Sequence, residues 1–332
     1  MNAAFIHRHS GHCESGTVAA LLRNNGLDLS EPMVFGIGGG LFFLYMPFIT
    51  MGGIPLISYR DAPRSILKNI CKRLGVRMHY ERFRDPDAGM AALDVQLAQD
   101  VPVGLQTSVF WLPYFPPDMR FQFNGHNLVA FGKRDGEYLL SDPVFEHTVH
   151  CPADALRRAR FAKGIFAPKG LMYWPESIPS DPDIKTAART AIAATARRML
   201  DIPFPFLGVR GIHTLARQLP RWPRTLGAER ARKYVGSVVR MQEEIGTGGA
   251  GFRFMYAAFL QEAGELLGND GLPEAARQLG ATGDRWRDFA VQGAQLVKDR
   301  ADDPATYRRL AETLRECAER EEQIFTRLKS AV

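Results

Sequence analysis

A cysteine stands directly before a helix-like segment near the start of the sequence, in GHCESGTVAALL (11–22). We expect Cys13 to lie at the N-terminus of this helix, where unpaired backbone N–H groups and the helix dipole favour a thiolate over a thiol. The same N–H groups could stabilise an oxyanion on an attacked carbonyl. An unreactive, buried helix-capping thiol would give the same pattern, because free cysteine also packs as a hydrophobic residue.

A histidine and an aspartate further along could complete a catalytic group. The stretch GHNLVAFGKRDGEYLLSDP (125–143) predicts two strands joined by a tight turn at Asp135-Gly136. If the strands pair across this turn, His126 and Asp142 lie at the same end of one hairpin. The carboxylate could then hold the imidazole in one tautomer and stabilise its charged form. Each residue alone has a simpler explanation, as a strand cap and a turn former, but their combination with an early cysteine favours nucleophilic catalysis.

The elements that must position these residues divide the chain into two parts. Residues 1–178 form an α+β domain with an early helix and a later antiparallel sheet. A proline-rich segment, PESIPSDPD (175–183), marks the boundary, and residues 183–332 carry helical periodicity with charged outer faces throughout. Helices are predicted near 16–26, 62–75, 88–100 and 153–162, and strands near 101–110, 127–132, 137–142 and 170–174.

The order of these motifs resembles papain-like cysteine enzymes, the peptidase domains of bacteriocin exporters among them, and is most similar to the family of butirosin biosynthesis protein H. In that family HCxS, here HCES (12–15), precedes a glycine-rich stretch, here FGIGGGLFFLY (35–45), and a helical domain follows the papain-like one. The resemblance implies an acyltransferase that moves an acyl group from a carrier-protein thioester, through an acyl-cysteine, to an amine or hydroxyl of a small-molecule acceptor. It implies Cys13 as the nucleophile, His126 as the base and Asp142 as the residue that orients the base.

Two positions depart from the papain-like peptidases. Six residues before the cysteine, where these enzymes have a glutamine that donates to the oxyanion, the chain has His7, whose imidazole could keep that role. Glu14 follows the cysteine where the peptidases have glycine, which changes the mouth of the pocket and argues against simple peptidase activity. The glycine run lacks the GK[ST] ending of a phosphate-binding loop, so we expect it to provide close backbone packing near the active-site helix. Three glycines of this run, Gly38, Gly39 and Gly40, are candidates for lining an acyl or pantetheine channel.

The chain carries 42 basic and 36 acidic side chains, a net charge of +6. Basic residues gather between residues 197 and 240, either as ordinary solvated helix faces or as a docking surface for an acidic acyl carrier protein. Aromatic residues are not interleaved with them on a known binding module, which argues against nucleic acid. The docking candidates are Arg197, Arg198, Arg230, Arg232 and Lys233.

The remaining patterns predict a cytoplasmic enzyme without a bound metal or cofactor, phosphopantetheine entering only on the carrier protein. Four scattered cysteines without a CxxC pair fit a reducing compartment, and the first residues show no basic region followed by an apolar one. The most apolar stretch, residues 33–57, holds six glycines and two prolines, so we expect no membrane span. The histidines near Cys13 lack a second ligand pair for a metal.

Three alternatives stay open. A thioesterase or cyclase could use the same triad, because the exclusion of water from the pocket decides between transfer and hydrolysis. A papain-like module could instead bind a carrier protein or another partner without turnover, in which case Cys13 would be unreactive. The amphipathic last helix could pack on the first domain or on a second copy of the chain, which would make a homodimer.

Overall fold

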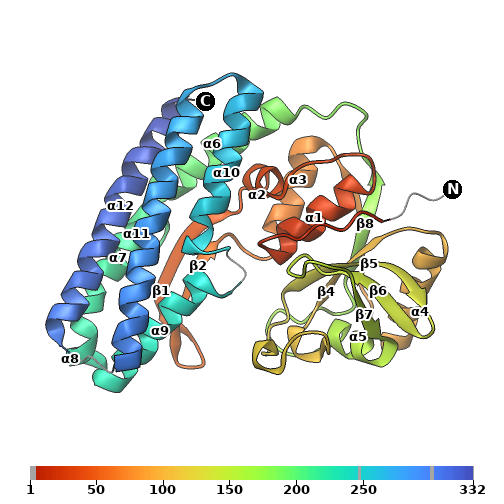
Figure 1. Ribbon diagram of the computed structural model, residues 1–332, viewed down its shortest axis with the longest axis horizontal. Coiled ribbons are helices and arrows are strands. Elements are labelled where there is room, and N and C mark those ends of the chain that lie inside the picture. Colours follow the sequence, from red (N-terminus) through yellow and green to blue (C-terminus); the bar gives the residue numbers. More distant parts are fainter. Residues whose placement is uncertain (1–4, 246–247, 300–302, 332) are drawn as a thin grey trace. The chain divides into compact units, whose positions relative to one another are not determined.

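The computed structural model describes residues 5–245, 248–299 and 303–331. Its chain folds into two compact units, each assembled from two separate stretches of sequence (Figure 1).

The first unit comprises residues 1–34 and 66–183, and the second comprises residues 35–65 and 184–332. This division differs from the sequence prediction, which assigned residues 35–65 to the N-terminal domain. The physical reason is aromatic packing within the second unit. The ring of Tyr59 meets that of Trp286 edge to face, with centroids 5.6 Å apart, and the ring of Phe43 lies 6.0 Å from the same indole.

The first unit is built on a six-stranded sheet with the order β3-β8-β4-β5-β6-β7, in which every pairing is antiparallel. Its strands are β3 (Arg77–Glu81), β4 (Val103–Thr107), β5 (His126–Arg134), β6 (Glu137–Ser141), β7 (Val149–Pro152) and β8 (Met172–Ser177). The helical elements are α1 (Cys13–Arg23), α3 (Ser65–Leu74), α4 (Pro86–Ala98), α5 (Ala153–Arg160) and the 3₁₀ turns η1 (Val109–Trp111) and η2 (Pro117–Met119). Helix α2 (Glu31–Ile37) spans the boundary between the two units.

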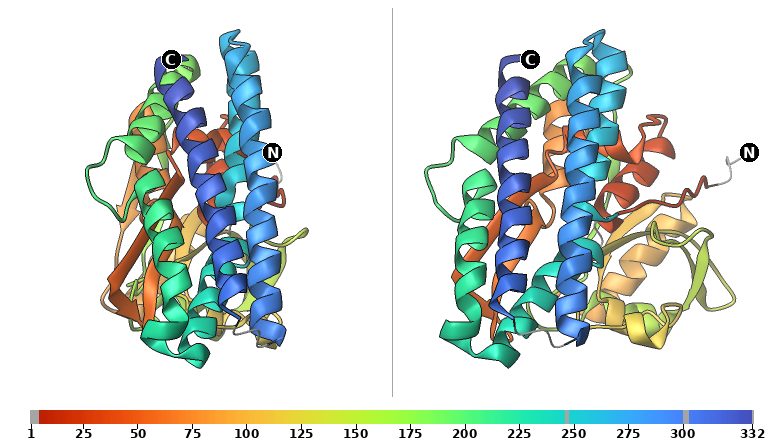
Figure 2. Two further views of the ribbon diagram at one scale, coloured as in Figure 1. Left: turned by 90° about the vertical axis from the view of Figure 1, so that its left-hand side faces the viewer. Right: turned by 60° about the vertical axis from the view of Figure 1, so that its left-hand side comes forward.

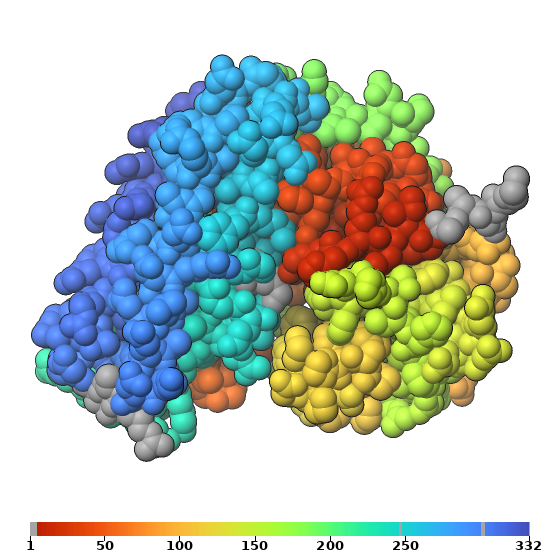
Figure 3. Space-filling model, in the orientation of Figure 1, coloured from red at the N-terminus to blue at the C-terminus, as the bar shows by residue number. Residues whose placement is uncertain are grey.

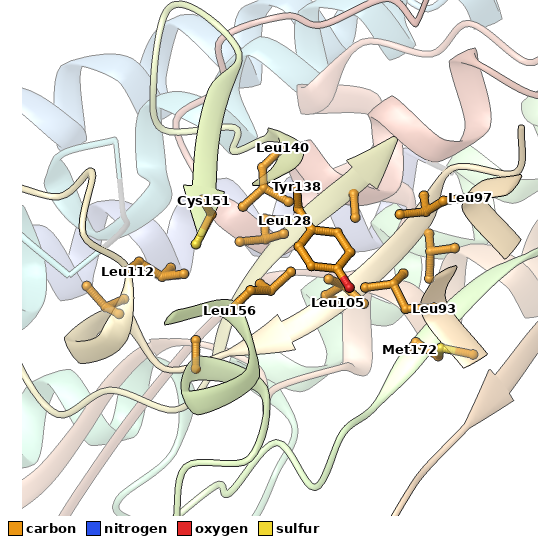
Figure 4. Packing of buried hydrophobic residues seen from close by; sticks show 14 of the residues in the cluster. Leu93, Leu97, Leu105, Leu112, Leu128, Tyr138, Leu140, Cys151, Leu156 and Met172 are labelled. Carbon is orange, nitrogen blue, oxygen red and sulfur yellow. The ribbon is translucent and has the colours of Figure 1, made fainter. Parts of the chain in front are cut away.

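One face of the sheet carries the hydrophobic core of the first unit. Leu105 of β4, Leu128 of β5 and Leu140 of β6 are fully buried in a single cluster, which Leu93 of α4 and Leu156 of α5 complete (Figure 4). Alternation along the strands explains why these positions share a face. The cluster fixes which side of the sheet each neighbouring residue of β5 and β6 takes.

A tight turn and a β-bulge set the register of the β5–β6 hairpin. Asp135 and Gly136 both adopt positive φ angles, 51° and 82°, as a two-residue hairpin turn of the type I′ class requires. From the turn the strands pair regularly as far as Gly132, opposite Leu139, but the next partner of Leu140 is Ala130. The residue between them is therefore an extra residue, which exchanges the two faces of β5 relative to β6 beyond that point.

The second unit combines a two-stranded sheet with helices, so the prediction of an all-helical second domain holds for the described residues between 184 and 331 but not for the hairpin that joins them. The strands are β1 (Leu41–Met51) and β2 (Ile54–Arg60). The helices are α6 (Ile184–Leu200), α7 (Gly208–Gln218), α8 (Trp222–Leu226), α9 (Ala228–Glu243), α10 (Arg253–Leu267), α11 (Gly271–Asp299) and α12 (Pro304–Ala331), with the 3₁₀ turns η3 (Leu219–Arg221) and η4 (Ala250–Phe252). Helices α6, α7 and α9 pack on the hairpin, and α10, α11 and α12 form one continuous surface of the unit (Figures 2 and 3).

A buried ion pair lies in the core of this second unit. The guanidinium of Arg253 contacts both carboxylate oxygens of Glu321, at 2.8 and 2.9 Å, and both side chains are fully buried. Trp286 donates its indole N–H to the same carboxylate at 2.6 Å, and the guanidinium lies over the rings of Trp286 and Tyr59. The charge is thus paired and hydrogen-bonded, as a buried charge must be.

Candidate active site

Cys13 is the first residue of α1 and is almost fully buried, with 8% of its surface exposed. The turn before it is held from two sides. His12 caps the helix by accepting the N–H of Ser15 through its side chain. Glu31, the first residue of α2, accepts the N–H groups of Gly11 and His12 at 2.7 and 2.8 Å and the hydroxyl of Ser15 at 2.8 Å. These bonds fix the direction in which the thiol leaves the helix.

His126 and Asp142 meet as the sequence predicted. The Nε2 atom of His126, at the start of β5, lies 2.7 Å from Oδ2 of Asp142, which follows the end of β6. The imidazole is 4% exposed and the carboxylate is fully buried. Asp142 occupies Nε2, which leaves Nδ1 as the other ring nitrogen, and Cys13 is among the groups that raise the pKa of this imidazole.

The electrostatics of His126 favour the imidazolium. Burial by itself would lower the pKa of His126, but the charge and hydrogen bond of Asp142, together with those of Cys13, raise this pKa from 6.5 to about 10. His126 is therefore able to hold a proton at neutral pH while it lies beside the thiol. That is the property expected of a base that takes the proton of Cys13 and returns it to a leaving group.

Three donors surround the Asp142 carboxylate. Oδ1 accepts the backbone N–H of Val144 at 3.3 Å, and Oδ2 accepts a bond from the hydroxyl of Tyr114 at 2.8 Å in addition to the bond from His126. Both oxygens of the buried carboxylate are thus hydrogen-bonded, as a buried polar group requires. Tyr114 comes from the loop between η1 and η2, and nothing in the local sequence around it indicates this contact.

His7 has a different environment from the one predicted for an oxyanion donor. Its Nε2 donates to the carbonyl oxygen of Phe145 at 3.0 Å, and its Nδ1 lies 2.7 Å from the hydroxyl of Ser141. Both ring nitrogens are thus engaged with the residues that flank Asp142. Within the same region, Ser10 donates its N–H to the carbonyl of Pro143 at 2.7 Å. The segment before α1 therefore ties the cysteine helix to the aspartate loop.

Glu14 does not line an open mouth. Its side chain is 1% exposed, and Oε1 accepts the backbone N–H of Leu67 in the first turn of α3, at 3.2 Å. A carboxylate at that position satisfies an otherwise unpaired helix N–H group and interacts favourably with the helix dipole. The residue after the cysteine thus anchors α1 to α3.

The glycine run lies in the second unit, apart from the unit that holds Cys13, and its contacts there are structural. A Cβ atom on Gly40 would approach the ring of Phe35 to 2.4 Å, and Gly39 adopts a φ of 64°. The carbonyl oxygens of Gly39 and Leu41 accept hydrogen bonds from Arg198 at 2.5 and 3.1 Å. Gly38 is buried in the same run.

Arg198 is therefore engaged in contacts within the second unit, where it is half-buried. Besides these carbonyls its guanidinium pairs with Asp61 and lies over the ring of Phe42, 5.3 Å from its centroid. The other predicted docking residues also lie in this unit. Arg197 is exposed, Arg232 is half-buried, Lys233 pairs with Glu229 one helical turn away, and Arg230 lies over the ring of Tyr234.

All four cysteines are free and buried. Burial raises the pKa of Cys71 to about 11 and that of Cys151 to about 12, and it also raises that of Cys317. Of the four, only Cys13 has an imidazole partner. Among the residues that the structure describes, no three histidine, cysteine or carboxylate side chains are placed to hold a metal ion, and no helix is long and apolar enough to cross a membrane.

Two family models and one solved structure are similar to parts of the chain. Residues 12–143 match the model of the N-terminal domain of butirosin biosynthesis protein H, and residues 154–328 match that of a domain of unknown function, DUF4872. A crystal structure described as that of a C39-like peptidase from Bacillus anthracis is similar over 53% of this chain and 96% of its own, with 12% identity and a TM-score of 0.37. None of the curated proteins compared with the chain matches it. The predicted fold class, an α+β domain with an antiparallel sheet followed by a helical C-terminal part, is confirmed.

Proposed function

Because the chain belongs to the butirosin biosynthesis protein H family, we propose that it is a cysteine-dependent acyltransferase with Cys13, His126 and Asp142 as its catalytic residues. The observation that carries the proposal is the buried 2.7 Å contact between His126 and Asp142 beside a cysteine at a helix N-terminus. The acyl donor is a thioester of an acyl carrier protein, and the acceptor is an amine or hydroxyl of a small molecule.

The first half-reaction forms an acyl-enzyme. His126 holds the proton of the Cys13 thiol, and Sγ attacks the carbonyl carbon of the thioester. The backbone N–H of Cys13, at the first helical position where intrahelical partners are lacking, supports the negative charge that develops on the carbonyl oxygen. The C–S bond to the carrier's pantetheine breaks, the departing sulfur takes the proton from His126, and an acyl-Cys13 thioester remains.

The second half-reaction passes the acyl group on. The acceptor nitrogen or oxygen attacks the acyl-Cys13 carbonyl while His126 removes its proton. The C–S bond to Cys13 then breaks, and the free enzyme returns with the proton on His126. Asp142 holds the imidazole so that Nδ1 stays directed at the sulfur throughout.

Intact-protein mass spectrometry tests the proposal. The wild-type chain is incubated with acyl-pantetheine thioesters and with acyl-carrier thioesters, and we expect a mass increase equal to one acyl group. Cys13→Ala should show none. Cys71→Ala removes another buried thiol of the same unit that has no imidazole partner, so it should be acylated like the wild type.

The fate of the adduct decides the reaction type. Release on addition of amines or alcohols with formation of the acylated acceptor supports acyl transfer, whereas release in water alone at the same rate indicates a thioesterase. If none of the thioesters modifies the wild type, the acyltransferase proposal is wrong, and a module that binds a partner without turnover becomes the better explanation.

A further inference from the structure

Tyr114 and His126 both contact the same carboxylate oxygen, Oδ2 of Asp142. Its hydroxyl donates to Oδ2 of Asp142 at 2.8 Å, and the His126 Nε2 atom lies 2.7 Å from this same oxygen. From this geometry we propose that Tyr114 is a positioning residue that sets the basicity of His126 by taking up part of the negative charge of Asp142. The inference rests on the part of the proposed function in which His126 exchanges a proton with Cys13.

Aromatic packing holds the tyrosine hydroxyl in place. The ring of Tyr114 meets that of Phe145 edge to face at 5.3 Å and lies 5.2 Å from that of Phe115. Phe115 in turn meets the imidazole of His126 edge to face at 5.4 Å. The rings of Phe115 and Phe145 thus connect Tyr114 with His126 and with the loop after Asp142. This packing leaves the Tyr114 hydroxyl little freedom to turn away.

The tyrosine remains a donor over the whole range in which the histidine titrates. Burial, followed by the charge and hydrogen bond of Asp142, raises the pKa of Tyr114 well above its ordinary value. The phenol therefore keeps its proton and withdraws electron density from Oδ2. A carboxylate oxygen that accepts a second bond attracts the proton of His126 less strongly than one that accepts a single bond.

Other titratable groups near the pair are few. Cys13 of α1 faces His126, and Cys151 of β7 acts on Tyr114 but has a pKa raised to about 12, so it stays neutral. His7 reaches the aspartate loop only through Ser141 and a backbone carbonyl.

The pH profile of Cys13 alkylation measures this effect without any acyl substrate. Iodoacetate is an anion, so the rate of its reaction with Cys13 falls as His126 loses its positive charge at high pH. This decrease is the falling limb of the pH profile. Tyr114→Phe keeps the ring and removes the hydroxyl, and we expect this falling limb to move upward by about one pH unit. In the Asp142→Asn background the same substitution should cause no further shift.

Tyr138→Phe is the matched control. The Tyr138 hydroxyl donates to a carboxylate oxygen of Asp94 at 2.7 Å in the same unit, without contact to Asp142. This variant should leave the limb in place. An unmoved limb in Tyr114→Phe, or an equal shift in Tyr138→Phe, would overturn the proposal. A downward shift would overturn it too, because it would mean that the tyrosine only holds the carboxylate in position.

A second variant covers the case in which Tyr114→Phe does not fold. Replacement of Tyr114 by 3-fluorotyrosine keeps the hydroxyl and makes it a stronger donor, so the limb should move downward. An unmoved or raised limb would contradict the inference. If the wild type forms no acyl-enzyme but the variants show these shifts, only the proposed acyl transfer is refuted. If the wild type forms the acyl-enzyme but the limbs do not shift in the variants, only the role of Tyr114 is refuted.

Discussion

At the scale of single residues, the raised pKa of His126 predicts a distinct pH dependence. A histidine whose folded-state pKa is about 10 rather than 6.5 stabilises the structure in its protonated form. This stabilisation is complete below about pH 6.5 and is lost as the pH rises through about 10. Alkylation of Cys13 by iodoacetate should therefore stay fast up to about pH 10 in the wild type and fall above it.

Asp142→Asn removes the charge that raises this pKa while it keeps an oxygen as acceptor. Burial then dominates, and the falling limb should move down by several pH units, to about pH 6.5 or below. Asp94→Asn removes a carboxylate charge of the same unit that pairs with Lys133 and Tyr138 and not with the imidazole; it is the control and should leave the limb unchanged. A wild-type limb near pH 6.5 would show that Asp142 has no such effect on His126.

Residue types and spacing were enough to predict that His126 and Asp142 lie near the open end of one hairpin, because the Asp-Gly turn signals that hairpin. The bulge that brings both side chains to the same side of it was not predicted. The additional bonds could not be predicted. Tyr114 reaches Asp142 across 28 positions and Glu31 reaches Ser15 across 16, and no local pattern marks contacts made by loops of this kind. His7 shows the opposite case, since its position suggested an oxyanion donor while its two nitrogens bind around the aspartate.

At the scale of elements, the cysteine helix packs tightly against the aspartate loop at Gly16. A Cβ atom there would lie 2.6 Å from Cβ of Pro143 and 2.6 Å from Cβ of Ser10. Gly16→Ala must therefore push α1 away from the loop. Because a displacement of 1 Å is costly in a catalytic group, we expect the rate of Cys13 acylation to fall by roughly tenfold to a hundredfold.

The control for this substitution is Gly280→Ala in α11, where a Cβ atom would meet nothing within 4 Å. It should leave acylation unchanged and raise the stability slightly, by about 0.5–1 kcal/mol. The free energy of unfolding, measured in parallel, separates displacement of α1 from loss of the fold. An unchanged acylation rate in Gly16→Ala would show that the loop adjusts.

The four α-helices α1, α3, α4 and α5 and four of the six strands of the first unit were predicted from their patterns, whereas the short strands β3 and β7 were not. The glycine-rich stretch was harder. Its glycines indicated close packing, and the structure has such packing at Gly40 and at Gly36, whose Cβ would meet the ring of Phe259 at 2.0 Å. Gly40 packs against Phe35, only five residues away, but Phe259 lies more than 200 residues from Gly36, and a glycine does not reveal which surface comes close to it.

At the scale of the whole molecule, the second unit depends on a hairpin that comes from the N-terminal half of the chain. A fragment of residues 184–332 lacks Phe43 and Tyr59, both buried, and exposes the ring of Trp286 that they cover. Loss of each buried aromatic costs about 3–5 kcal/mol. We expect this fragment to bind a hydrophobic dye and to unfold without a cooperative transition.

A single chain in which residues 35–65 are fused to residues 184–332 is the matched comparison, because it restores the hairpin without the first unit. It should melt cooperatively and bind little dye, as measured by circular dichroism and dye fluorescence. Cooperative melting of the helical fragment alone would contradict this account. The proline-rich segment predicted the start of the helices but gave no sign that an earlier part of the chain joins them.

Because β5 contains one extra residue at its bulge, His126 and Asp142 lie on the same side of the hairpin. Side chains alternate along a strand, so this outcome depends on whether the number of residues between His126 and the turn is odd or even. With a regular ladder from the Asp135-Gly136 turn, Asp142 would pair with Val129, and His126 would point to the opposite side of the hairpin. Removal of one residue at the bulge should therefore separate the two side chains while the turn and both strands persist. In related sequences that keep this site, the number of residues between the histidine and the turn, relative to the number between the turn and the aspartate, must then stay odd or even as it is here, even where the residues themselves change.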